Sequence, residues 1–370
     1  MFKRYLTTQI IHDLEKKMVF VAGPRQVGKT ILAKSIMKDE TGYLNWDIAE
    51  HRESILKREL PPTDFLVFDE IHKYRSWRNY LKGLYDKNPG HIKILVTGSA
   101  KLDFYRFGGD SLQGRYHLLR LYPLTCAELD IKTTNDLLEL LRLGGFPEPF
   151  FGKSEVEAKR WSREYRDRLI GEEITSLEHV MDLGNLELLS LRLPDLVGSP
   201  LSINSLRNDL QVSHKTVSHW LNILERLYAI IRIKPFGSPL LRAVKKEQKH
   251  YHLDWTLVAD QSLRFENLMA IHLLKWVCYE QDTKGRDLEL KYFRDVDGRE
   301  VDFIITENLK PHLLIEVKWS DADVSKGLRY LKRRFPNAEA FQLSAIGKKD
   351  YVNKDGINVK PALKFLDTLI

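Results

Sequence analysis

The chain has 370 residues, of which 43% are hydrophobic and 29% charged, and a formal net charge of +7 at pH 7. This length predicts two or three domains, each with its own core, and the composition excludes disordered and fibrous proteins. The two cysteines, with no Cys or His pairs at ligand spacing, argue against a disulfide framework and against a zinc site.

No apolar stretch is long enough to span a bilayer, and the first residues lack the apolar core of a secretion signal. We therefore expect a cytoplasmic protein with no membrane partner. The positive charge favours polyanionic partners. Basic side chains concentrate at residues 242–250 and 325–335, although either run alone is also typical of a solvated surface.

The first functional signal is the pattern G-x-x-x-x-G-K-T at residues 23–30, directly after an apolar run at 18–22 that predicts a buried strand. The glycines let successive backbone N–H groups point at one anion, and the helix expected after residue 30 adds its positive end. Lys29 is predicted to reach the β- and γ-phosphates of a nucleotide, and the Thr30 hydroxyl to bind Mg²⁺. The alternative is an ordinary glycine-rich turn, which does not require a strand before it and a helix after it.

A second buried strand is predicted at residues 65–70, where four apolar residues are followed by two acids, Asp69 and Glu70. In open α/β sheets, ligands bind at the carboxyl ends of the strands. Asp69 is therefore predicted to hold Mg²⁺, directly or through water, and Glu70 to polarise the water that attacks the nucleotide. The alternative is an acidic turn after a core strand.

The next strand is expected at residues 92–97, and it should bring a hydroxyl group to the γ-phosphate. Ser99 is the first candidate and Thr97 the second; a hydroxyl that bonds the local backbone is the alternative. With strands at 43–47 and 117–121, the pattern predicts a mostly parallel sheet covered on both faces. The predicted nucleotide-binding residues are Gly23, Pro24, Arg25, Gln26, Val27, Gly28, Lys29, Thr30 and Ser99.

Arg115 lies just before the last predicted strand. An arginine there is a candidate for neutralising charge during phosphoryl transfer, either in its own subunit or in the neighbouring subunit of a homo-oligomer. The alternative is an ordinary surface arginine.

Six short segments carry a family resemblance: residues 23–30, 68–73 with Trp77, 97–99, 112–115, 121–125 and 143–148. They resemble the signatures of a large group of prokaryotic AAA-like ATPases. The resemblance implies an ATP-hydrolysing module of the additional-strand P-loop type. It also implies a C-terminal domain similar to restriction endonucleases of the PD-(D/E)xK type.

The middle of the chain has a helical pattern followed by the pattern of a winged helix-turn-helix. In the second part, a helix is expected at residues 203–210, then a helix capped by Ser213, then a basic hairpin. A DNA-binding module of this kind places its second helix in the major groove and its wing on phosphate. The alternative is a module that only links domains or contacts neighbours.

The C-terminal part carries a D…E-x-K arrangement of Asp302, Glu316 and Lys318. Glu316 and Lys318 are two residues apart, so they share one face of a strand. Two carboxylates of this kind bind Mg²⁺ or Mn²⁺, and the lysine orients or deprotonates the water that attacks a phosphodiester. Glu266, on the preceding helix, would add a metal ligand as in similar nucleases. The alternative is a salt-bridged strand pair in a domain that only binds.

The predicted fold is α/β, with an AAA-like P-loop ATPase domain at 1–130, a helical lid or connector at 131–184, a winged helix-turn-helix at 185–260 and a restriction-endonuclease-like domain at 261–370. The predicted function is that of an ATP-hydrolysing, DNA-associated protein whose nucleotide state controls nucleic-acid binding or metal-dependent cleavage. The alternative is a nucleotide-switched regulator or scaffold with a non-cutting nuclease-like domain. The predicted cofactors are ATP and Mg²⁺, with Mn²⁺ as a second option at the nuclease-like site.

Overall fold

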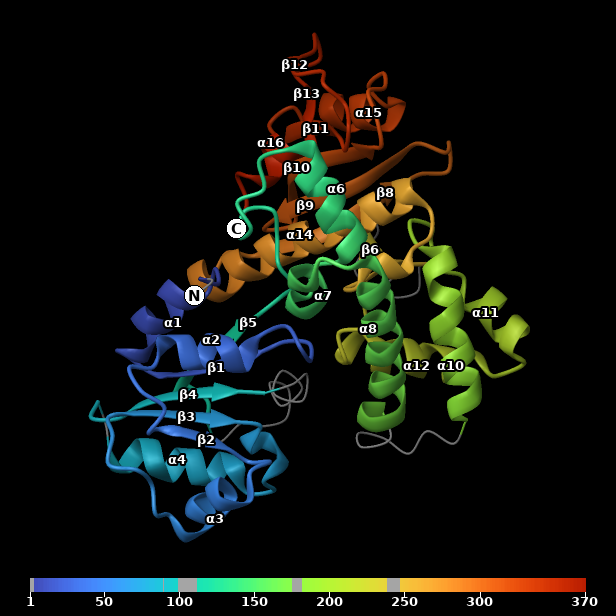
Figure 1. The fold of residues 1–370 in the computed structure, drawn as a ribbon. Coiled ribbons are helices and arrows are strands. Elements are labelled where there is room, and N and C mark those ends of the chain that lie inside the picture. The colour runs from blue at the N-terminus through green and yellow to red at the C-terminus, as the bar shows by residue number, and fades with distance from the viewer. Residues whose placement is uncertain (1–2, 89, 99–111, 175–181, 238–246) are drawn as a thin grey trace. The chain divides into compact units, whose positions relative to one another are not determined.

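The structure of the chain, a computed structural model, describes residues 3–88, 90–98, 112–174, 182–237 and 247–370. The chain forms two compact units (Figure 1). The N-terminal unit comprises Met1–Pro123 and Asp282–Lys284, and the C-terminal unit comprises Leu124–Gln281 and Gly285–Ile370. Among the described helices, none has the length and hydropathy needed to cross a membrane.

A five-stranded parallel sheet is the centre of the N-terminal unit, in the order β2-β3-β4-β1-β5. The strand β4 lies between β1 and β3, as expected for the additional-strand type of P-loop protein. Strand β1 and the first four residues of β3 are apolar and almost wholly buried, which is typical of a parallel sheet covered on both faces. The strands are β1 (Met18–Ala22), β2 (Tyr43–Asn45), β3 (Phe65–Asp69), β4 (Lys93–Thr97) and β5 (Tyr116–Arg120).

Helices cover both faces of this sheet: α1 and α2 lie on one side, and α3 and α4 on the other (Figure 1). The core between sheet and helices is built from large side chains such as Phe20, Phe68 and Trp77. The helices are α1 (Thr7–Leu14), α2 (Lys29–Ile36), α3 (Ala49–Lys57) and α4 (Trp77–Lys87). The α/β fold predicted for this part of the chain is confirmed.

The C-terminal unit begins with helices, as the sequence pattern predicts. Side chains of Thr133, Ser154 and Asp182 cap three of them by accepting a hydrogen bond from a backbone N–H in the first turn. The role of this region as a lid or connector stays a prediction. Its elements are α6 (Thr134–Leu143), α7 (Pro147–Gly152), α8 (Glu155–Arg168), the π-helical turn Leu169–Ile174 and α10 (Leu183–Arg192).

Two further helices and a hairpin occupy the region expected to be a winged helix-turn-helix. Ser213 caps the second helix by accepting a hydrogen bond from the Thr216 N–H, as predicted. The expected hairpin, however, extends a larger sheet, because β6 also pairs in parallel with β8. The elements are α11 (Ile203–Leu210), α12 (His214–Arg226), β6 (Ile230–Pro235) and β7 (Lys249–His252).

This larger sheet has eight strands in the order β12-β13-β11-β10-β9-β8-β6-β7. Helix α15 packs its apolar residues Leu328 and Leu331 against the sheet, beside Ile304 and Leu314. The remaining elements are α14 (Gln261–Lys284), β8 (Leu288–Arg294), β9 (Glu300–Glu307), β10 (Lys310–Lys318), α15 (Lys326–Arg334), β11 (Glu339–Ser344), β12 (Tyr351–Val352), β13 (Asn358–Pro361) and α16 (Ala362–Leu366).

Candidate functional site

The loop between β1 and α2 has a backbone that requires its glycines. A Cβ atom on Gly23 would lie 2.2 Å from the carbonyl oxygen of Leu121, so no other residue fits without displacing backbone. Gly28 has a φ of 97°, in the left-handed region that glycine adopts readily, and it precedes the first residue of α2. The predicted strand, anion-binding loop and helix are therefore present in order.

Lys29 lies over this loop and is only 8% exposed. Its Nζ donates hydrogen bonds to the carbonyl oxygens of Gly23, at 3.0 Å, and Pro24, at 2.6 Å. The amine is thus already placed above the loop whose N–H groups would hold phosphates. The Arg4 guanidinium secures the same loop by donating to the carbonyl oxygen of Val27, at 2.6 Å. The sequence pattern gave no sign of this contact.

Asp69 stands at the end of β3 and is 3% exposed. Three hydroxyl groups donate to its carboxylate, those of Thr30 (2.7 Å), Tyr43 (2.8 Å) and Thr97 (2.7 Å). Thr30 and Asp69 therefore present two hard oxygen atoms side by side, which is the donor type that Mg²⁺ requires. These residues fit the predicted metal. Thr97 contacts Asp69 rather than the local backbone. The hydrogen bond from Tyr43 to Asp69 was not predicted from the sequence.

Glu70 follows Asp69 in a left-handed backbone conformation, with φ 57°. Its carboxylate lies 3.5 Å from the Lys73 amine and 3.6 Å from the His72 ring nitrogen. Burial raises the pKa of Glu70 above its ordinary value, while Lys73 and Lys29 act in the opposite direction. A carboxylate with a raised pKa is better suited to accept a proton from water.

The two remaining N-terminal candidates have different outcomes. Ser99 lies outside the described residues. Arg115 forms a two-pronged ion pair with Asp86, and its carbonyl oxygen accepts from the N–H of Met18, at the start of β1. Met18 precedes Gly23, the first residue of the phosphate-binding loop, by five residues, which is roughly 17 Å along the strand at ~3.3 Å per residue. A role within its own subunit therefore does not fit, and the role in a neighbouring subunit stays a prediction.

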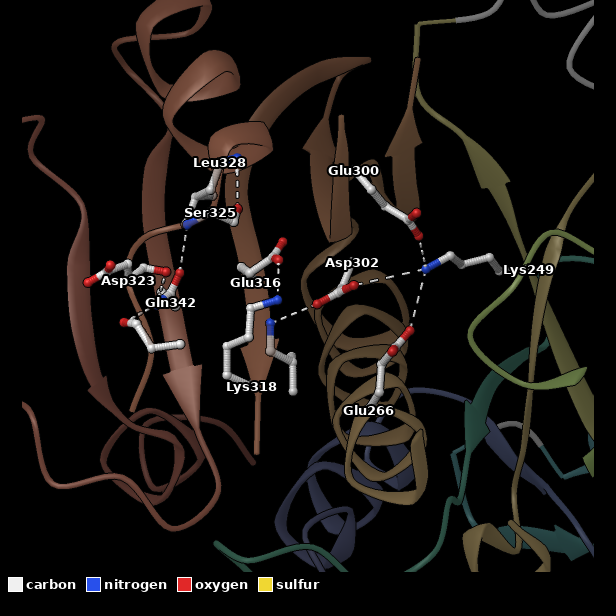
Figure 2. Close-up of polar contacts among 12 residues, drawn as sticks. Lys249, Glu266, Glu300, Asp302, Glu316, Lys318, Asp323, Ser325, Leu328 and Gln342 are labelled. Atoms are coloured by element: carbon white, nitrogen blue, oxygen red, sulfur yellow. Dashed lines mark hydrogen bonds and ion pairs between the residues drawn. The ribbon is translucent and has the colours of Figure 1, made fainter. Parts of the chain in front are cut away.

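In the C-terminal unit, the D…E-x-K residues come together on the neighbouring strands β9 and β10 (Figure 2). The pairing of Ile315 with Phe303 brings Glu316 beside Asp302. Asp302 accepts a hydrogen bond from the Val317 N–H at 2.8 Å, and the Lys318 amine lies 2.6 Å from Glu316. The predicted proximity of these three side chains is present.

A fourth residue, Lys249 at the start of β7, enters the same cluster (Figure 2). Its side chain is 1% exposed, and its Nζ lies 2.6 Å from Glu300, 3.4 Å from Glu266 and 4.0 Å from Asp302. Glu266 also accepts a hydrogen bond from the Tyr251 hydroxyl at 2.7 Å. The sequence pattern placed Lys249 in the basic run at residues 242–250, whereas the structure places it in an acidic centre made of Glu266, Glu300, Asp302 and Glu316.

The electrostatics of this acidic centre follow from burial. Burial, and then repulsion from Asp302, raise the pKa of both Glu266 and Glu316. Burial disfavours the charged form of Lys249, but Glu266, Asp302 and Glu300 more than offset it and raise the pKa of the amine. Lys249 is therefore a protonated ammonium ion at neutral pH.

The donor set for a metal at this centre is incomplete in the structure. Within the described ranges, no three His, Cys, Asp or Glu side chains are arranged to hold an ion. One feature does favour a cation: the Oε2 atom of Glu316 is buried with no hydrogen-bond partner among the described residues. Glu266, expected to supply a ligand from α14, instead contacts Lys249 and Tyr251.

Comparison with known protein families divides the chain into three segments. Residues 15–130 match the model described as an AAA domain. Residues 134–267 and 264–365 match two models described as domains of unknown function, DUF8612 and DUF4143. The P-loop and the parallel sheet agree with the first match, so the N-terminal unit has the fold of an AAA-like P-loop domain.

Similar proteins extend over most of the chain. The uncharacterized protein Rv2008c of Mycobacterium tuberculosis is 22% identical and covers 84% of this chain and 73% of its own length. The uncharacterized protein MJ1637 of Methanocaldococcus jannaschii is 26% identical over 65% of this chain and 61% of its own length. The Aeropyrum pernix ORC1 protein, solved in complex with DNA, is 15% identical over 72% of this chain and 89% of that one, but its TM-score of 0.33 supports no conclusion.

Proposed function

We propose that the N-terminal unit binds ATP with Mg²⁺ and hydrolyses it. The observation that carries this proposal is the contact between Thr30 and Asp69 at 2.7 Å, directly beside the phosphate-binding loop. Lys29 would bind the β- and γ-phosphates, while Thr30 and Asp69 would hold the metal, which neutralises charge on the phosphates. Glu70 would take a proton from the attacking water.

Two substitutions separate nucleotide binding from hydrolysis. Lys29→Ala should abolish tight ATP binding, because it removes the charge that faces the phosphates. Glu70→Gln should keep ATP binding but lower turnover by roughly 10²–10⁴-fold, because only proton transfer is lost. Isothermal titration and a phosphate-release assay measure the two effects.

The matched control is Lys57→Ala on α3, because Lys57 is exposed and pairs with Glu53 rather than with the loop. This variant should bind and hydrolyse ATP as the wild type does. Full turnover by Glu70→Gln would remove Glu70 from the mechanism.

The C-terminal unit is proposed to bind nucleic acid under the control of the nucleotide state. A groove of about 950 Å³ in this unit combines aromatic rings with two arginines, and two acids, Glu247 and Asp295, also line it. Bases stack on aromatic side chains and arginines attract phosphates, so this lining suits a single strand. The aromatic lining residues that support this proposal are Phe236, Phe293, Tyr330 and Phe335, and the arginines are Arg294 and Arg334.

The two basic runs of the sequence are alternative surfaces for nucleic acid. Lys245 and Lys246 lie outside the described residues. Arg329 and Arg333 of α15 both pair with Asp355, at 3.8 and 3.1 Å, so part of their charge is already compensated. Exposed residues at the start of α12, such as His214 and Lys215, offer a second contact surface.

Binding to phosphates makes affinity fall linearly with salt on a logarithmic scale. Arg294→Ala and Arg334→Ala should each weaken binding to labelled oligonucleotides and make this slope shallower by about 0.7–0.9. Fluorescence anisotropy over a salt series, with and without ATP, measures both effects. Arg160→Ala, an exposed arginine of α8 that pairs with Glu157, is the control. Binding that is unchanged in both variants would show that the groove is not the nucleic-acid site.

This proposal has two versions: the C-terminal unit either cuts the nucleic acid or only binds it. In the first, Asp302 and Glu316 hold Mg²⁺ or Mn²⁺, and Lys318 orients or deprotonates the attacking water. In the second, the acidic centre is non-cutting and the chain is a nucleotide-switched regulator or scaffold. The contact of Lys249 with Glu266 and Asp302 favours the second version. A cleavage panel over single-stranded, duplex and branched substrates distinguishes them: EDTA-sensitive cutting that Glu316→Ala abolishes would establish the first.

A further inference from the structure

The position of Lys249 sets what the acidic centre can bind. Its side chain is 1% exposed, and its ammonium group lies among Glu266, Glu300 and Asp302. The strand that carries it is fixed, because Lys249 pairs with Ile233 in the antiparallel hairpin. A divalent ion and an ammonium ion cannot share one position among the same carboxylates, because each needs their oxygen atoms as direct neighbours.

A second observation places an open cation position elsewhere in the same centre. Glu316 is 5% exposed. One of its oxygens contacts Lys318 at 2.6 Å, and the other is buried without a hydrogen-bond partner in the described part of the chain. An unpaired buried carboxylate oxygen is costly, so it marks a place where a cation would be stabilised. Asp302, on the adjoining strand, is the neighbouring acid.

We propose that the Lys249 ammonium occupies the cation position of the acidic centre. Glu266 and Glu300 then pair with this ammonium and do not act as metal ligands. Asp302 and Glu316 are then left to hold at most one divalent ion, and to hold it weakly. Replacing Lys249 by an uncharged side chain frees Glu266, Glu300 and Asp302 as a tighter cation site. This inference concerns cation binding alone and does not depend on whether the C-terminal unit binds DNA.

The test is Mn²⁺ binding to the full chain without nucleotide, followed by electron paramagnetic resonance of the free ion. All proteins carry Asp69→Asn, so that the N-terminal metal position contributes nothing, and the chain with this substitution alone is the parent. Lys249→Met has a similar length and no charge, and it should bind Mn²⁺ at least roughly tenfold more tightly than the parent. Adding Glu266→Gln to Lys249→Met should reverse this gain. Mn²⁺ should also raise the melting temperature of Lys249→Met more than that of the parent.

Lys275→Met is the matched control. Lys275 is also fully buried, and it pairs with Glu128 in the same unit, away from the acidic centre. Its removal reports the general effect of losing a buried lysine, and it should leave Mn²⁺ affinity unchanged. The proposal is overturned if Lys249→Met binds Mn²⁺ no more tightly than the parent.

A second measurement decides the question even if Lys249→Met fails to fold. With Lys249 in place, Glu266→Gln should leave the weak Mn²⁺ affinity unchanged, whereas Glu316→Gln should abolish it. A tenfold or greater loss of affinity in Glu266→Gln alone would mean that Glu266 is a metal ligand beside Lys249, and the proposal would be wrong.

Discussion

Asp69 in the N-terminal unit and Asp302 in the C-terminal unit are both largely buried strand residues, but their neighbours differ. Neutral hydroxyl groups of Thr30, Tyr43 and Thr97 donate to Asp69, so its negative charge is stabilised without being cancelled. Asp302 lies 4.0 Å from the Lys249 ammonium, and its neighbour Glu316 lies 2.6 Å from Lys318. The first arrangement keeps charge available for a metal ion, whereas the second supplies much of the countercharge from the protein itself.

This difference shows that a cluster of acids is not by itself a metal site. Burying an unpaired carboxylate costs free energy, and a protein lowers this cost with hydrogen-bond donors, with a fixed cation or with a metal. Three expected outcomes would sharpen or break the comparison, and the largest concerns Asp69.

Asp69→Asn should lower ATP turnover by roughly 10²–10³-fold, because it removes the charge that holds Mg²⁺ while keeping a side chain of the same shape. The corresponding Asp302→Asn should leave ATP turnover unchanged. A phosphate-release assay over a Mg²⁺ series measures both. Wild-type turnover in Asp69→Asn would show that the two carboxylates do not differ in the way that we describe.

Tyr43→Phe tests whether the hydroxyl donors position Asp69. The variant loses the 2.8 Å hydrogen bond, so we expect the Mg²⁺ concentration needed for half-maximal turnover to rise by roughly tenfold. Tyr80→Phe is the matched control, because the Tyr80 hydroxyl has no hydrogen-bond partner among the described residues. Equal Mg²⁺ dependence in the two variants would rule out a positioning role for Tyr43.

The third expected outcome concerns stability against acid in the C-terminal unit. Burial lowers the pKa of His250 to about 4 and that of His252 to about 3. Both rings are therefore neutral in the folded state. In the unfolded chain, by contrast, each histidine takes up a proton near the ordinary histidine pKa of about 6.5. Stability is fully present above pH 6.5 and is lost as the pH falls towards these lower values, by on the order of 1–2 kcal/mol per histidine between pH 7 and 5.

Urea unfolding at pH 7 and pH 5, followed by tryptophan fluorescence, measures this loss. His252→Gln should reduce the difference between the two pH values, and His214→Gln, at an exposed position of α12, should not. The same acid sensitivity in His252→Gln and the wild type would contradict the assignment.

Much of the N-terminal site was accessible from the sequence because its signals are local. The loop at residues 23–30 follows β1 directly, Asp69 is the last residue of β3, and Glu70 comes next, so short patterns suffice to place them. The spacing of Glu316 and Lys318 likewise fixes that both side chains share a face of β10.

The tertiary structure alone decided which distant residues complete each site. Tyr43 reaches Asp69 because β2 pairs with β3. Arg115 is remote from the phosphate-binding loop because β5 begins beside Met18, at the opposite end of β1 from the loop. Lys249 enters the acidic centre because the β6–β7 hairpin joins the C-terminal sheet through β8. Such pairings depend on packing between segments far apart in the chain, so a basic run in the sequence looks the same whether its lysine faces solvent or lies buried among carboxylates.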